Sequence, residues 1–167
     1  GDVLLFVIPT YLQIGPALEA FADTPVQIGA QDVATDDTGA FTGEVSAAEL
    51  AEVGVVLAEI GHAERRRLFG ETDAVVAAKA AAALRNGILP VLCLGESERL
   101  ETAAAATTTV AQLHADLAGA PDGPVIVAYE PVCAIGAPEP APAEHIVGVA
   151  RALHDALEAT RPGSIVI

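Results

Sequence analysis

The segment VVLAEIGHAERR, residues 55–66, decides the fold, because an apolar run passes directly into a polar turn. The run at residues 55–60 is almost continuously apolar, with no strict alternation of apolar and polar side chains. Such continuity is typical of a strand that is buried on both faces of a parallel sheet. The polar residues that follow therefore mark the C-terminal end of a strand, where α/β proteins place their functional groups.

The same pattern recurs along the chain. Five further apolar runs predict strands at residues 3–8, 26–30, 88–94, 124–129 and 164–167. Helix-like segments lie between them at residues 73–86, 102–118 and 144–160. Gly87 suits the C-terminal cap of the first helix, and Ser46 with Glu49 resembles a capping box. Strands and helices that alternate at this spacing predict right-handed βαβ units around a parallel sheet.

Six strands with five connections fit two architectures, an open doubly wound sheet or a (β/α)8 barrel. A complete barrel takes roughly 250 residues, whereas this chain has 167. The chain opens close to one apolar run and ends in another, so both ends look cut, which favours a fragment of a barrel. We therefore expect residues 1–167 to form a single partial barrel domain.

The charge balance excludes some partners. Acidic residues outnumber basic ones by 23 to 8, and this net charge of −15 argues against nucleic acid and against an anionic membrane surface. The longest uncharged run, residues 3–18, is interrupted by Pro9 and Pro16, so it predicts no membrane-spanning helix. A signal peptide has a basic region before its apolar stretch, and no such region precedes this run. Cys93 and Cys133 are too few for a disulfide framework and favour the reducing cytoplasm.

Two polar residues at strand ends are candidate catalytic groups, His62 and Glu130. A histidine ring at a strand-to-helix turn can accept a backbone N–H from the start of the helix, which favours a neutral imidazole that donates to a carbonyl. Glu130 emerges at the lip of an apolar core, where a carboxylate is a good general base. Such a pair suits proton abstraction next to a carbonyl. On spacing alone, a structural histidine and a solvated loop glutamate remain open as alternatives.

Five segments resemble the triosephosphate isomerase family. GHAERRRLFGE, residues 61–71, is similar to the segment around the family's catalytic histidine, and AYEPVCAIG, residues 128–136, to the segment around its catalytic glutamate and mobile lid. GAQDV at 29–33, GAFTGEVS at 39–46 and VLCLGES at 91–97 resemble the family in the same order and spacing. The resemblance spans nearly the whole chain and implies a TIM barrel, of which this chain covers about strands 2 to 7, with the first and last strands absent.

The resemblance implies an isomerase that interconverts glyceraldehyde 3-phosphate and dihydroxyacetone phosphate through an enediolate, with no metal and no cofactor. It implies that Glu130 is the base and His62 the electrophile, the pairing known for this family. Gly136 matches a lid glycine whose N–H binds the substrate phosphate, and Glu64 matches a carboxylate that supports the polar network of the active site.

The resemblance also implies a homodimer, because Thr42, Gly43 and Glu44 match a loop that inserts into a partner subunit. It implies a cytoplasmic enzyme of glycolysis and gluconeogenesis. Cys93 and Glu96 match buried residues of the family, the first expected to pack and the second to pair with a cation. Arg65, Glu71 and Lys79 are expected to be structural, and so is Arg66.

The chain departs from the family at several positions. The family's catalytic lysine after its first strand is absent, since Lys79 is the only lysine. Ala63 stands where the family has serine, and Cys133 where it has the tryptophan of the first lid hinge. At the lid tip, residues 136–139 read Gly-Ala-Pro-Glu instead of Gly-Thr-Gly-Lys, which predicts a stiffer and more negative lid.

These departures leave the substrate open. The altered lid leaves room for a longer substrate such as a tetrulose phosphate, and a non-catalytic relative that binds a phosphorylated metabolite is a further alternative. We expect the 167 residues alone to lack isomerase activity, because that lysine and the glycine-rich phosphate turns after the last two barrel strands are absent.

Overall fold

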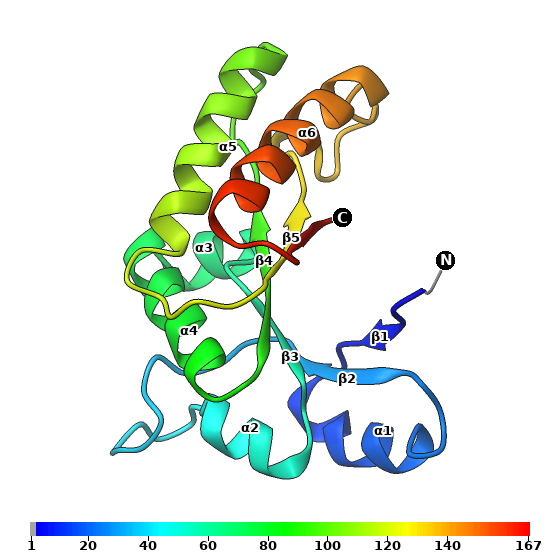
Figure 1. Cartoon of the computed structure of the whole chain (residues 1–167), viewed down its shortest axis with the longest axis vertical. Coiled ribbons are helices and arrows are strands. Elements are labelled where there is room, and N and C mark those ends of the chain that lie inside the picture. The colour runs from blue at the N-terminus through cyan, green and yellow to red at the C-terminus, as the bar shows by residue number, and fades with distance from the viewer. Residues whose placement is uncertain (1–2) are drawn as a thin grey trace.

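The computed structural model describes residues 3–167, so residues 1 and 2 of the predicted domain lie outside the described part (Figure 1). Six strands form one sheet: β1 Phe6–Val7, β2 Gln27–Ala30, β3 Leu57–Ile60, β4 Leu89–Leu94, β5 Ile126–Tyr129 and β6 Ile165–Val166. They lie in the order of the chain, and all five neighbouring pairs are parallel. A doubly wound sheet would reverse its strand order at a switch point. The order found here is that of a barrel wall, which confirms the predicted partial barrel.

The helices are α1 Ile14–Ala20, α2 Ala47–Val53, α3 Ala63–Phe69, α4 Asp73–Arg85, α5 Thr102–Asp116 and α6 Ala143–Thr160, with short 3-10 turns at Tyr11–Gln13 and Val132–Ala134. Every predicted strand and helix is present, with ends that differ by at most three residues. The strands at the two edges, β1 and β6, are the shortest because each pairs on one side only. The helix α1 was not predicted, and Pro16 is tolerated in its first turn because N–H groups there have no partner within the helix.

The capping box at the start of α2 is confirmed. The Ser46 side chain accepts the N–H of Glu49 at 3.1 Å, and the Glu49 carboxylate accepts the N–H of Ser46 at 3.3 Å. After the C-terminal end of α4, Gly87 has a φ of +72°, a left-handed conformation that glycine adopts without strain. Local sequence signals thus set the start of α2 and the end of α4.

Both faces of the sheet are apolar, which explains why the predicted strands are almost continuously apolar. One face carries Leu57, Val91 and Ile126, with Phe6 and Ala128 packed against them. The other face lies under α4, α5 and α6, as Figure 1 shows, and its cluster joins strand side chains to helix side chains, including Ile60, Leu92, Val127, Val76, Leu113 and Leu153. Successive side chains of a strand point to opposite faces, so the central strands bury side chains on both faces of the sheet.

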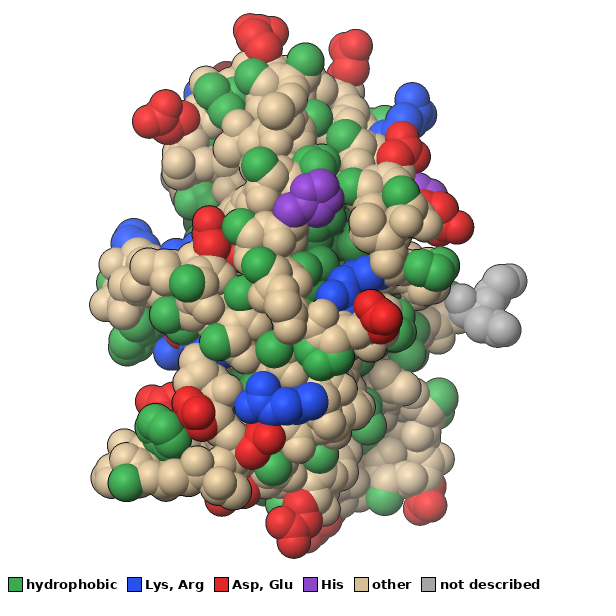
Figure 2. Space-filling model, turned by 60° about the vertical axis from the view of Figure 1, so that its left-hand side comes forward, with side chains coloured by type: hydrophobic (Ala, Val, Ile, Leu, Met, Phe, Trp, Pro, Cys, Tyr) green, Lys and Arg blue, Asp and Glu red, His purple; other side chains and the backbone are tan. Residues whose placement is uncertain are grey.

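The surface is mixed in character. Acidic and basic side chains are scattered singly over the face shown in Figure 2. Within residues 3–167, no helix combines the length and the apolarity that a membrane crossing needs. Large apolar side chains are exposed at Phe41 in the β2–α2 loop and at Leu68 and Phe69 of α3. Exposed apolar groups of this size are candidates for contact with a partner.

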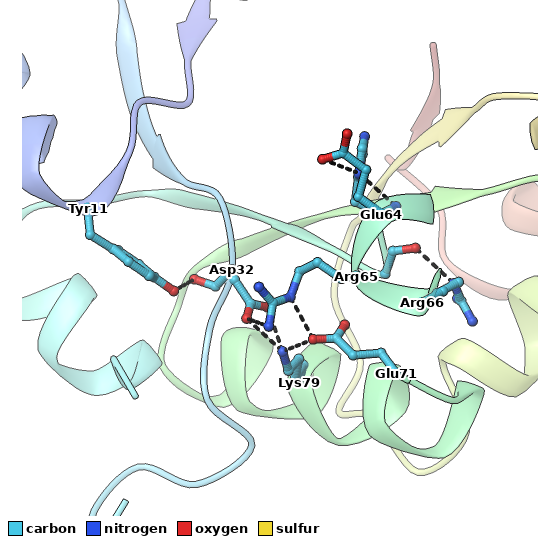
Figure 3. A network of polar contacts seen from close by, with 9 residues as sticks. Tyr11, Asp32, Glu64, Arg65, Arg66, Glu71 and Lys79 are labelled. Atoms are coloured by element: carbon cyan, nitrogen blue, oxygen red, sulfur yellow. Dashed lines mark hydrogen bonds and ion pairs between the residues drawn. The ribbon is translucent and has the colours of Figure 1, made fainter. Parts of the chain in front are cut away.

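A cluster of charged side chains ties the end of β2 to α3 and α4 (Figure 3). The ammonium of Lys79 donates to both carboxylate oxygens of Asp32, at 2.6 and 2.8 Å, and to Glu71 Oε1 at 2.6 Å. Arg65 donates to the same two carboxylates, to Asp32 at 2.9 Å and to Glu71 at 2.6 Å. The Tyr11 hydroxyl donates to the carbonyl oxygen of Asp32 at 2.6 Å. The expected structural role of Arg65, Glu71 and Lys79 is confirmed.

The two carboxylates respond differently to these surroundings. Burial raises the pKa of Asp32, and the hydrogen bond from Lys79 offsets only part of that effect. Burial also opposes the ionisation of Glu71, but hydrogen bonds from Lys79 and Arg65 outweigh it and hold the pKa of Glu71 below its usual value. Both cations are therefore needed to keep two neighbouring buried carboxylates in place.

Replacing Lys79 tests how much the cluster stabilises the fold. Lys79→Met removes the ammonium and leaves Asp32 and Glu71 with one cation between them, so we expect the free energy of unfolding to fall by about 3–5 kcal/mol. Arg85→Ala is the control, because Arg85 pairs with Asp37 at the surface at 2.8 Å, where such a pair contributes about 0–1 kcal/mol. Urea denaturation measures both variants, and equal losses would contradict this account of the cluster.

Candidate active site

His62 and Glu130, the two candidate catalytic residues, face each other across the C-terminal end of the sheet. His62 follows β3 and Glu130 follows β5, so one strand separates them. The distance from His62 Nε2 to Glu130 Oε1 is 3.7 Å, longer than a hydrogen bond. Their side chains are 30% and 33% exposed, so the pair is partly shielded and still accessible.

The start of α3 sets the orientation of His62. His62 is the N-cap residue of this helix, and its Nδ1 accepts the backbone N–H of Glu64 at 3.3 Å. A nitrogen that accepts a hydrogen bond carries no proton, so the proton of a neutral ring lies on Nε2. The nitrogen that faces Glu130 is therefore the one that can donate to an oxygen of a bound molecule.

Glu130 is held through its backbone and free at its carboxylate. Its N–H donates to the carbonyl oxygen of Leu94 at 3.0 Å, which continues the pairing of β4 with β5. Among residues 3–167, its buried Oε1 atom has no hydrogen-bond partner. A buried carboxylate oxygen without a donor has lone pairs available to accept a proton. A proton acceptor thus lies opposite a proton donor, the arrangement that proton transfer beside a carbonyl requires.

A close backbone approach sets the position of Glu130. A Cβ atom on Gly95 would lie 1.8 Å from the Glu130 carbonyl oxygen, so only glycine allows this contact between the ends of β4 and β5. The N–H of Gly95 donates to Gln112 Oε1 at 3.2 Å, which ties this strand end to α5. Gln112 could not be selected from the sequence, because a glutamine inside a helix carries no signal of a distant partner.

Arg66 holds the turn that presents His62. Its Nε donates to the carbonyl oxygen of Gly61 at 2.8 Å, directly before His62 in the chain. The two ends of its guanidinium donate to Asp73 at 2.6 Å and to Asp116 at 2.7 Å. Burial raises the pKa of Asp116 to about 7, although Arg66 opposes the shift. The expected structural role of Arg66 is confirmed.

The remaining predicted site residues lie at different places. Glu64 is exposed, with Oε2 3.9 Å from His62 Nδ1. Gly136 lies on the exposed segment after the second 3-10 turn, with a φ of +72°. The loop with Thr42, Gly43 and Glu44 is exposed between β2 and α2 and juts out at the lower left of Figure 1. In the described part of the chain, no hydrogen bond or ion pair joins Gly136 or this loop to His62 or Glu130.

Cys93 and Glu96, the two residues that match buried positions of the family, are both buried in the structure. Cys93 is buried, as expected, and its Sγ lies 3.6 Å from Glu59 Oε1, while burial raises the pKa of its thiol. Glu96 is buried, but its partners are His145 and the hydroxyl of Tyr129 rather than a lysine or arginine. Within residues 3–167, no three or more His, Cys, Asp or Glu side chains are grouped so that they could hold a metal ion.

Comparison with known proteins identifies the family. The family profile described as triosephosphate isomerase matches residues 1–165. The chain belongs to the triosephosphate isomerase family. Over 153 residues it is 52% identical to L-erythrulose-1-phosphate isomerase of Pectobacterium atrosepticum, a match that covers 89% of the chain and 59% of that protein. Over 155 residues it is 45% identical to triosephosphate isomerase of Thermus thermophilus, which covers 90% of the chain and 62% of that protein.

The fold agrees with this assignment. A crystal structure of triosephosphate isomerase from Bartonella henselae superposes with a TM-score of 0.81 at 26% identity, over 98% of this chain and 69% of that one. The chain thus spans about three fifths of the length of the curated relatives named above. The half-barrel described here corresponds to part of their barrel.

The titration of Asp116 predicts a pH-dependent stability. Its folded pKa near 7 lies above the unfolded value of about 3.9, so the folded state binds a proton more tightly. Stability from this group is therefore present at low pH and is lost as the pH rises toward 7 and above. Asp116→Asn removes the titration, so the parent should gain stability relative to this variant as the pH falls from about 8 to about 5. Urea denaturation across this range tests it, and a pH-independent difference would refute the assignment.

The close approach at Gly95 predicts a steric effect. Gly95→Ala must displace the Glu130 backbone, and we expect a loss of about 1–3 kcal/mol in the free energy of unfolding. Gly15→Ala serves as the control, because a Cβ on Gly15 in α1 meets no atom within 4 Å. The melting temperatures of the two variants compare them, and a Gly95→Ala protein as stable as the control would show that the contact is not restrictive.

Proposed function

We propose that the full-length protein that contains this chain is an aldose–ketose isomerase of small sugar phosphates. The observation that carries the proposal is the Oε1 of Glu130, which has no hydrogen-bond partner among residues 3–167 and lies 3.7 Å from Nε2 of His62. Glu130 serves as the base and His62 as the electrophile. Membership of the triosephosphate isomerase family supports this reading.

The proposed reaction moves a proton between two adjacent carbons. The Glu130 carboxylate takes the proton from the carbon beside the carbonyl and returns it to the former carbonyl carbon. The Nε2–H of His62 gives its proton to the carbonyl oxygen as negative charge develops on it, and the ring then takes the proton of the neighbouring hydroxyl, so that the second carbonyl can form. Because Nδ1 is occupied by the N–H of Glu64, the ring presents the correct nitrogen before a substrate binds. No atom is gained or lost in the overall isomerisation.

Triose phosphate is the first candidate substrate, and a tetrulose phosphate is the second. The relative with 52% identity acts on L-erythrulose 1-phosphate by its name, whereas the triosephosphate isomerase of T. thermophilus is 45% identical. The segment after Glu130 also carries Pro138 and Glu139, which alter the contacts available to the end of a substrate. These two observations are the reason to test the four-carbon sugar phosphate as the second candidate substrate.

Further roles follow from the same proposal. The backbone N–H of Gly136 binds the substrate phosphate, and Glu64 supports the polar network beside His62. Thr42, Gly43 and Glu44 contact a second subunit, which makes the protein a homodimer. The exposed side chains of Phe41, Leu68 and Phe69 support this contact, because apolar groups of their size need cover. We propose a cytoplasmic enzyme of glycolysis and gluconeogenesis.

Substitution of the base tests the function. In the full-length protein, Glu130→Gln should lower kcat about a thousandfold, because the amide keeps the shape of the side chain and cannot take the proton. His62→Gln should lose less, since an amide still donates a hydrogen bond. Glu158→Gln on the exposed side of α6 is the matched control and should retain the parent rate.

The assay uses dihydroxyacetone phosphate and L-erythrulose 1-phosphate in parallel. The substrate with the higher kcat/KM decides between the two candidates. Parent turnover of neither, together with measurable binding, would establish the non-catalytic alternative. A Glu130→Gln protein that works at the parent rate on either sugar would show that Glu130 is not the base.

A further inference from the structure

Glu96, just past β4, is a buried carboxylate that two other segments hold. Its side chain is 1% exposed. The Tyr129 hydroxyl lies 3.0 Å from Oε2 and 3.2 Å from Oε1, and His145 Nε2 lies 2.9 Å from Oε1. A carboxylate removed from water is stable only while donors satisfy it, so both contacts matter to the fold around Glu96.

These two donors flank the segment 131–142, which follows the proposed base. Tyr129 is the last residue of β5 and directly precedes Glu130, whereas His145 lies in the first turn of α6, three residues after Pro142. Both ends of the segment are thus attached to a single carboxylate. The distance between the two ends is set at Glu96, outside the segment itself.

The direction of the hydrogen bonds follows from the chemistry of the groups. Burial and the hydrogen bond to Glu96 raise the pKa of Tyr129, so its hydroxyl stays protonated and donates. An ionised carboxylate only accepts, so Nε2 of His145 carries a proton and donates to Glu96. In a neutral ring Nδ1 then accepts the hydroxyl of Thr102, which lies 3.2 Å away at the start of α5.

The packing of α5 against α6 allows this arrangement. A Cβ atom on Gly148, one turn after His145, would lie 2.5 Å from the Thr102 methyl group. Glycine at this position therefore lets the two helices approach closely enough for Thr102 to reach the His145 ring. A cavity of about 350 Å³ lies beside the network and is lined by both ends of the segment, including Cys133 and Pro142.

We propose that His145 is a positioning residue. It holds the C-terminal end of segment 131–142 to Glu96, the carboxylate that also holds Tyr129 at the N-terminal end of the segment. Loss of the His145 donor loosens the first turn of α6 and, through Glu96 and Tyr129, the backbone that carries Glu130. The structural part of this inference stands on the contacts alone, and its catalytic part rests on the proposed function. Within residues 3–167, no hydrogen bond or ion pair joins His145 to His62 or Glu130, so His145 acts through Glu96.

Amide hydrogen exchange tests the structural part without any substrate. The N–H groups of Ala134, Ile135 and Ala137 donate to backbone oxygens within the segment. His145→Ala should speed their exchange about tenfold, the effect of losing a hydrogen bond to a charged group. His145→Gln should restore most of the protection, because its side-chain amide can donate to Glu96. His154→Ala is the matched control, since His154 lies on the same helix, its side chain is 58% exposed, and it is 3.7 Å from the exposed Asp155.

Fluorotyrosine NMR gives a second readout. The chain has two tyrosines and no tryptophan, and Tyr11 lies in the cluster around Asp32, away from Glu96. In protein labelled with 3-fluorotyrosine, His145→Ala should shift the resonance of Tyr129 and leave that of Tyr11 unchanged. Tyr129→Phe assigns the two signals. Thr102→Val, which removes the hydroxyl at Nδ1, should shift the same resonance by a smaller amount and covers the case in which His145→Ala does not fold.

Kinetics test the catalytic part on whichever sugar phosphate the parent isomerises. His145→Ala should lower kcat about tenfold with a smaller change in KM, and His145→Gln should recover most of the loss. A parent without activity would defeat the proposed function and leave the exchange and NMR results to decide the role of His145. Unchanged exchange of the three amides and an unchanged Tyr129 resonance in folded His145→Ala would overturn the inference, and so would a His145→Gln protein that behaves like His145→Ala.

Discussion

The arrangement of the site depends on one buried ammonium group, that of Lys79. It holds carboxylates from two segments, Asp32 just past β2 and Glu71 just before α4. Arg65 binds the same carboxylates from α3, the helix whose N-cap residue is His62. A charge on α4 therefore fixes where α3 begins, and the start of α3 fixes the direction of the imidazole. The chemistry at the end of the sheet thus rests on packing between helices that lie outside it.

The strands, the three longest helices and the two central site residues could be predicted because local patterns determine them. A continuous apolar run is enough to predict a strand that is buried on both faces. The spacing of Ser46 and Glu49 is enough to predict a capping box. His62 and Glu130 could be selected because parallel strands bring their C-terminal ends to the same edge. The structure places these two residues together and leaves their catalytic roles to experiment.

Contacts between distant segments could not be predicted. His145 and Gln112 have the sequence context of ordinary helix residues, and their partners Glu96 and Gly95 lie 49 and 17 positions away. The helix α1 was missed because it has only seven residues and contains Gly15 and Pro16 near its start, a dipeptide that is typical of turns. Glu96 is held by a phenol and an imidazole rather than by a lysine or an arginine, and no spacing rule predicts these two donors.

Proton exchange with solvent tests the central claim most directly. A base that removes a proton from carbon and returns one to the neighbouring carbon exposes that proton to exchange while the carboxyl group holds it. When the full-length protein turns over its sugar phosphate in D₂O, the account predicts deuterium on the product carbon that receives the proton, detected by proton NMR. It also predicts that Glu130→Gln abolishes this incorporation. Turnover and deuterium incorporation by Glu130→Gln at the parent rate would contradict proton transfer by Glu130.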